Sequence, residues 1–153
     1  MKATIICIGN RFVAEDAAGT AVFDILQAMQ PLPAQVELVE GGLAGLNLLP
    51  HLEQGGRVVF VDAVRGFAEE GEIVLFTHQE ILQAKAPLHH DHGAGLAYVL
   101  AVLPKVCDGE LPEEIVLLGL EGRCAVQTVE KAAEMAVVIA TEGLRGLRRW
   151  EKR

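Results

Sequence analysis

The chain has 153 residues, of which 51% are hydrophobic and only 5% aromatic, and a formal net charge of −8 at pH 7. This length predicts a single domain spanning residues 1–153, and the aliphatic composition predicts strands buried on both faces. An acidic chain without a recognisable nucleic-acid-binding motif is not expected to bind nucleic acid. No apolar run approaches the ~18 residues of a membrane span and no signal peptide is evident, so we expect a soluble cytoplasmic protein.

Apolar runs alternate along the chain as strands and helices. Strands are expected at 4–8, 35–39, 57–61, 72–76 and 114–120, and helices at 17–29, 43–52, 96–106 and 125–149. Residues 77–86 should mix loop and helical turn. The link before the fourth strand is too short for a parallel crossover, so that strand should run antiparallel. The pattern predicts a three-layer α/β/α domain with a mostly parallel five-stranded sheet, strand order 2-1-3-5-4, and the antiparallel strand at an edge.

The nucleophiles and glycine motifs of several enzyme classes are missing. Serine is absent from the chain, which excludes a serine nucleophile, and there is neither a G-x-G-x-x-G fingerprint nor a P-loop. Three cysteines without a C-x-x-C pair argue against a disulfide framework. Cys7 lies in the first apolar run and is expected to be buried, which leaves Cys107 and Cys124 as the only candidates for thiol catalysis.

Three ionisable residues follow predicted strands or lie in an adjoining loop, where open α/β folds bind their ligands. Asp16 follows the first strand, Asp62 follows four apolar residues of the third, and His92 precedes the helix at 96–106. Each carboxylate has a structural alternative: Asp16 could cap the helix at 17–29, and Asp62 could be a turn or cap residue. Glu15 competes with Asp16 for the inward position.

The run His89-His90-Asp91-His92 places four titratable side chains in succession. Adjacent residues cannot all face one site, so we expect at most one or two of them to be ligands. Two carboxylates and one imidazole suit a borderline divalent ion such as Ni²⁺, Zn²⁺ or Co²⁺, and three protein ligands leave positions open for substrate or water. Only the fold can bring these residues together, because their spacing is not local.

The motifs, taken in order, resemble those of hydrogenase maturation endopeptidases, which trim the C-terminus of the large subunit of nickel–iron hydrogenases. The matching pieces cover nearly the whole chain and are Ile8-Gly9-Asn10, Glu15-Asp16-Ala17-Ala18-Gly19, Glu40-Gly41-Gly42-Leu43-Ala44-Gly45-Leu46, Val61-Asp62-Ala63, His92-Gly93-Ala94-Gly95-Leu96-Ala97 and Leu118-Gly119. Each piece is weak alone, but the ordered set is fairly specific. Two departures are Cys7, where many members have glycine, and Glu121-Gly122-Arg123, where many have a proline.

The resemblance implies a function and a site. The family's metal-contacting positions match Asp16, Asp62 and His92, and the spacing from Gly9 favours Asp16 over Glu15. It implies an endopeptidase, an aspartyl protease in type, that acts on a nickel-loaded large-subunit precursor. The nickel would then come with the substrate rather than stay bound as a cofactor. Asp16 and Asp62 would be the catalytic residues, and either an aspartate or the metal would activate the attack on the peptide bond.

Two other functions remain open from the residues. The first is a non-catalytic assembly factor with the same fold and metal contacts, which binds a metalloprotein precursor without cleaving it. The second is a small-molecule hydrolase or phosphorylase with a closed pocket on a similar fold. We expect the endopeptidase to be a monomer.

Overall fold

The computed structural model describes residues 1–84 and 95–152. Its elements follow the predicted alternation: β1 (Ala3–Ile8), η1 (Ala14–Asp16), α1 (Ala18–Ala28), β2 (Val36–Gly42), η2 (Leu46–Leu52), β3 (Arg57–Val64), β4 (Ile73–Thr77), α2 (His78–Gln83), α3 (Gly95–Val106), β5 (Glu114–Glu121) and α4 (Val126–Glu151). No helix in the described part of the chain is long and apolar enough to span a membrane.

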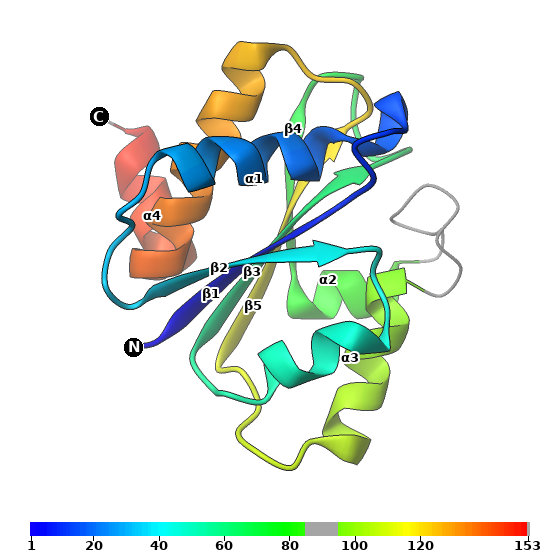
Figure 1. Ribbon diagram of the computed structural model, residues 1–153, viewed down its shortest axis with the longest axis vertical. Coiled ribbons are helices and arrows are strands. Elements are labelled where there is room, and N and C mark those ends of the chain that lie inside the picture. The colour runs from blue at the N-terminus through cyan, green and yellow to red at the C-terminus, as the bar shows by residue number, and fades with distance from the viewer. Residues whose placement is uncertain (85–94, 153) are drawn as a thin grey trace.

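The sheet has the predicted topology. The strand order is β2-β1-β3-β5-β4; β1, β2, β3 and β5 run parallel, whereas β4 pairs antiparallel with β5 at one edge. In Figure 1, α1 and α4 lie on one face of the sheet, and η2, α2 and α3 lie on the other. The expected three-layer α/β/α fold with one antiparallel edge strand is therefore confirmed.

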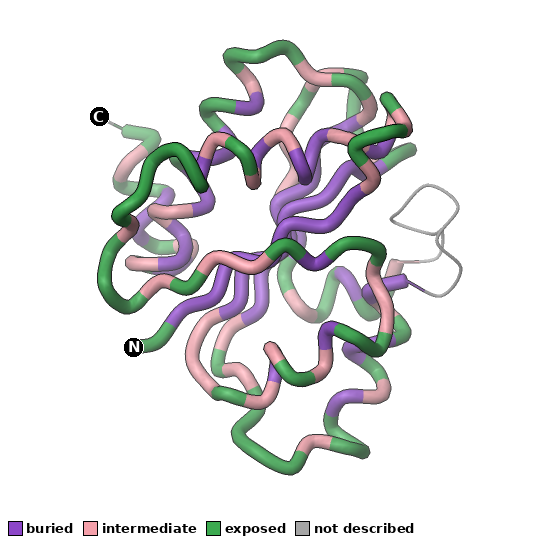
Figure 2. Tube along the Cα trace, in the orientation of Figure 1, coloured by how far each residue is buried: buried purple, intermediate pink, exposed green. Residues whose placement is uncertain are grey.

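Alternating side chains of the central strands build two separate cores. In β1, Ile5 and Cys7 belong to the core under α1 and α4, whereas Ile6 and Ile8 belong to the core on the α3 side. All six residues of β1 are buried, which explains why the strand appears in the sequence as an unbroken apolar run. Figure 2 shows the buried stretches concentrated in the central strands.

Three local expectations differ from the structure. The predicted helix at 43–52 is a shorter 3₁₀ helix, η2, in which Leu48 and Leu52 are buried and Leu46 is about half exposed, as is Leu43 before the helix. The mixed segment 77–86 begins with a regular helix, α2, because Thr77 and Glu80 form a reciprocal capping box. The third strand continues past Val61 to Val64 because β5 pairs with it over that length.

Candidate active site at the carboxyl edge of the sheet

Asp62 lies within β3, two residues before its last residue Val64, and not beyond the strand as predicted. It is opposite Gly119 of β5 in the parallel register, and its side chain is fully buried. Side chains alternate along a strand, and Phe60 and Val64 both belong to the core on the α3 side. Asp62 therefore faces that same side, at the end of β3 where the carboxyl ends of parallel strands meet.

Asp16 ends the short helix η1 in the loop between β1 and α1. The backbone of this loop is tied together: Asn10 N–H donates to the Asp16 carbonyl at 2.9 Å and Asp16 N–H donates to the Val13 carbonyl at 2.9 Å. Asp16 is 1% exposed, so it is the inward member of the acidic pair, as predicted. The N-cap residue of α1 is Ala17, one position later, so the alternative in which Asp16 caps this helix is wrong.

Close backbone packing brings the Asp16 loop against β3. A Cβ added to Gly19, in the first turn of α1, would lie 1.9 Å from the Ile8 carbonyl oxygen and 2.9 Å from that of Val61. The helix start thus rests directly on the ends of β1 and β3, and η1 contacts β3. The fold therefore places Asp16 and Asp62 at the same edge of the sheet, on adjoining elements.

The thiols do not provide a nucleophile at this edge. Burial, followed by the negative charge of Asp62, raises the pKa of Cys7 well above its ordinary value. Burial, together with Glu70 and Glu121, also raises the pKa of Cys124. A reactive cysteine needs a lowered pKa, so the two carboxylates are the better candidates for chemistry.

His92, with His89, His90 and Asp91, falls outside the described residues. The residues that are described contain no group of three or more His, Cys, Asp or Glu side chains placed to hold a metal ion. The proposed set needs His92 as its third ligand, so it stays a prediction. The following helix, α3, packs on the face of the sheet toward which Asp62 points.

Two residues near this edge were not predicted to matter. Glu121, at the end of β5, is 5% exposed, and Arg123 donates to Glu15 across 3.0 Å. The sequence singled out this segment only as a departure from the family pattern. The signal that could have found Glu121 is the one that found Asp62, a carboxylate directly after a buried apolar strand.

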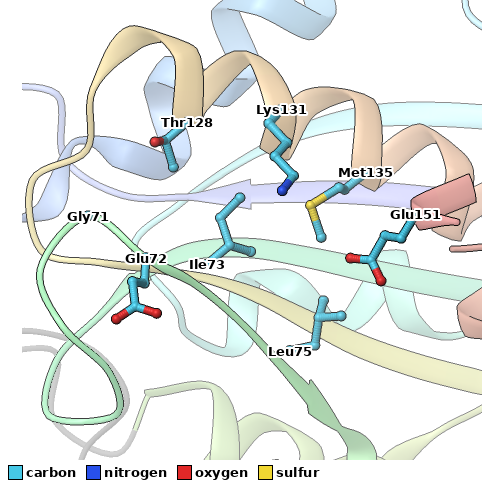
Figure 3. Close-up of a pocket in the computed structure, with 8 residues that line it drawn as sticks. All are labelled: Gly71, Glu72, Ile73, Leu75, Thr128, Lys131, Met135 and Glu151. Carbon is cyan, nitrogen blue, oxygen red and sulfur yellow. The ribbon is translucent and has the colours of Figure 1, made fainter. Parts of the chain in front are cut away.

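A separate groove lies between the edge strand β4 and helix α4. It has a volume of about 400 Å³, and Lys131 and Met135 of α4 point into it toward Ile73 and Leu75 of β4 (Figure 3). Neither Asp16 nor Asp62 lines it. The groove is therefore distinct from the edge that carries Asp16 and Asp62.

The fold is a three-layer α/β domain with two buried carboxylates at the carboxyl edge of its sheet, and comparison with known proteins assigns the chain to a family. Residues 20–141 match the family model described as hydrogenase maturation protease. The chain belongs to the hydrogenase maturation protease family and is a peptidase with a processing role.

Relatives and solved structures agree with this assignment. The hydrogenase 2 maturation protease of Escherichia coli (strain K12) is 26% identical over 78% of this chain and 73% of its own. The hydrogenase expression/formation protein HoxM of Cupriavidus necator is 29% identical over 94% of this chain and 72% of its own. The hydrogenase maturating endopeptidase HybD of E. coli superposes with a TM-score of 0.70 at 26% identity, covering 97% of this chain and 93% of that one.

Proposed function

We propose that this protein removes a C-terminal peptide from the nickel-loaded large-subunit precursor of a nickel–iron hydrogenase. The observation that carries the proposal is Asp62, a fully buried carboxylate in a strand whose neighbouring residues are apolar. A hydrophobic residue would serve packing at least as well, so a carboxylate at this position favours a chemical role. Membership of the family and the nearby burial of Asp16 support the same conclusion.

Nickel belongs to the substrate in this proposal. Asp16, Asp62 and His92 would contact the ion carried by the precursor, since carboxylate and imidazole donors suit a borderline divalent metal. A precursor without nickel would lose these contacts, so the ion would act as a checkpoint for cleavage. Asp16 or Asp62 would take a proton from the attacking water, or the metal would polarise the scissile carbonyl. We expect the enzyme to act as a cytoplasmic monomer.

The test compares precursor with and without nickel. Incubation with the protein should shorten only the nickel-loaded precursor, as measured by intact-mass spectrometry. The variants Asp16→Asn and Asp62→Asn should each lower kcat/KM by about 10²-fold or more, because each removes a group with a direct role in the reaction.

The control is Asp108→Asn, a matched change at an exposed position. It should leave processing unchanged, and circular dichroism should show that all three variants are folded. A wild-type protein that leaves nickel-loaded precursor uncut would contradict the proposal. Stable co-purification with that uncut precursor would instead favour a non-catalytic assembly factor.

A further inference from the structure

The carboxylate of Glu121 is surrounded by backbone donors of the loop that follows β3. Gly66 N–H donates to Oε2 at 2.9 Å, and Phe67 and Ala68 N–H groups donate to Oε1 at 2.8 and 2.9 Å. Hydrogen bonds to an ionised acceptor are among the strongest in proteins. Glu121 thus fixes three successive residues of a loop that begins just after the strand carrying Asp62.

Main-chain hydrogen bonds hold the same loop at both ends. Gly122 N–H donates to the Val64 carbonyl at 3.1 Å, and Gly71 N–H donates to the Glu121 carbonyl at 2.7 Å. Gly122 has φ +64°, a conformation that suits glycine. The end of β5 is therefore bonded to the beginning, the middle and the end of the loop after β3.

Arg123, two residues after Glu121, contacts the other loop of the candidate site, which lies between β1 and α1. Its Nη2 donates to Glu15 Oε1 at 3.0 Å, and the two side chains are 64% and 39% exposed. A hydrogen bond from its own backbone N–H is the larger cause that holds the pKa of Glu15 below its ordinary value, and the hydrogen bond and charge of Arg123 add to it. Glu15 directly precedes Asp16, so this ion pair joins the segment after β5 to the loop that carries Asp16.

We propose that Glu121 and Arg123 are positioning residues that set Asp16 and Asp62 relative to each other. Glu121 holds the chain leaving Asp62, and Arg123 holds the neighbour of Asp16. An exposed ion pair contributes little to stability, whereas a small misplacement of a reacting group can lower a rate strongly. The proposal rests on the proposed peptidase activity for its kinetic readout, but its structural part can be measured without it.

The first experiment is a charge swap. Arg123→Glu and Glu15→Arg should each lower kcat by about fivefold or more, because each lets the loop that carries Asp16 shift and so misplaces a reacting group, with KM and Tm nearly unchanged. The double variant Glu15→Arg/Arg123→Glu should recover most of kcat. The matched control is the remote exposed pair Glu142–Arg149, with 3.6 Å between Oε1 and Nη2, where the same swaps should leave kcat unchanged.

The second experiment measures amide hydrogen exchange by NMR. Glu121→Gln should speed exchange at residues 66–68 by about tenfold or more, since an amide side chain cannot accept from all three N–H groups as the carboxylate does. Arg123→Glu should speed exchange at residues 13–16 by a similar factor, because the loop loses the ion pair between Glu15 and Arg123. Glu113→Gln, at an exposed position before β5, is the control and should change neither loop.

These readouts separate the two proposals. A wild-type protein that does not process precursor contradicts the proposed function, while exchange still decides whether Glu121 and Arg123 hold the loops. Unchanged exchange in both loops overturns the positioning role. Single variants that lose activity without recovery in the swap also overturn it, because Arg123 would then act on substrate directly. Glu121→Gln can lower the stability of the fold. The swap of the exposed residues Glu15 and Arg123 does not depend on that variant, so it tests the positioning role by itself.

Discussion

At the scale of single residues, Cys7 is a buried thiol whose titration is influenced by the nearby Asp62. Cys7 stays protonated in the folded protein because burial and then Asp62 raise its pKa from the ordinary 9.0. The unfolded thiol ionises above that value, so the stability that the protonated thiol provides is present below about pH 9 and is lost as the pH rises beyond it. From about pH 9 to pH 10, this thiol should lower the free energy of unfolding by about 1 kcal/mol.

Urea unfolding at both pH values measures the effect, with Cys7→Ala as the comparison. The variant lacks the thiol and should lose about 1 kcal/mol less than the wild type over this interval. Other alkaline groups, including Cys124, cancel in the difference because both proteins contain them. Equal losses in the two proteins would contradict the prediction.

The sequence predicted the two carboxylates for reasons that the structure explains. Asp62 is conspicuous because it ends an apolar run, but its place inside β3 depends on pairing with β5, which lies more than fifty residues later. The family resemblance, through the spacing from Gly9, implied Asp16 rather than Glu15, and the burial of Asp16 agrees with that choice. The partner of Glu15 could not be foreseen, because Arg123 is 108 residues away. The role of His92 stays a prediction.

At the scale of elements, the contact of α1 with β1 and β3 depends on Gly19. A methyl group there would lie 1.9 Å from one carbonyl oxygen and 2.9 Å from a second, so Gly19→Ala must move the helix off the sheet. We expect a loss of about 3 kcal/mol in the free energy of unfolding, at the upper end for overpacking. The displaced helix start should also lower processing, because Asp16 lies directly before it.

Gly45→Ala is the matched control for this change. Its φ is −163°, which any residue adopts, and its nearest neighbour is the side-chain oxygen of Asn47 at 3.2 Å. Chemical denaturation should show a loss of less than about 0.5 kcal/mol for this variant. Similar losses for the two glycine variants would show that the helix tolerates a methyl group at position 19.

The elements were predictable where a periodic pattern coincides with burial. The strands are continuous apolar runs, and α1 and α4 have long apolar faces. The segment 43–52 misled because Leu43, Leu46 and Leu49 recur at helical spacing, yet the segment forms a 3₁₀ helix whose buried leucines are Leu48 and Leu52. This helix contacts α3, a long-range neighbour that local periodicity does not reveal.

At the scale of the whole molecule, the ion pair of Arg57 and the candidate site lie at opposite ends of β3. Arg57 begins β3, five residues and therefore about 17 Å before Asp62. Its Nε donates to Glu114 Oε1 at 2.6 Å and its Nη1 donates to the Ala140 carbonyl at 2.9 Å. Gly143 interrupts the helical geometry of α4 with φ 72°, so Arg57 supplies a donor to a helix carbonyl next to the kink.

This arrangement predicts that substitutions at the two ends of β3 act independently, one on the free energy of unfolding and the other on processing. Arg57→Leu removes hydrogen bonds from a charged group that joins β3, β5 and α4, so it should lower the free energy of unfolding by about 2–3 kcal/mol. At temperatures where the variant is folded, kcat/KM should equal that of the wild type, because the candidate site lies at the other end of β3. Asp62→Asn should show the reverse, with processing lost and the fold retained. Thermal unfolding and processing assays on the same preparations measure both quantities, and a loss of kcat/KM in folded Arg57→Leu would show that the two ends are coupled.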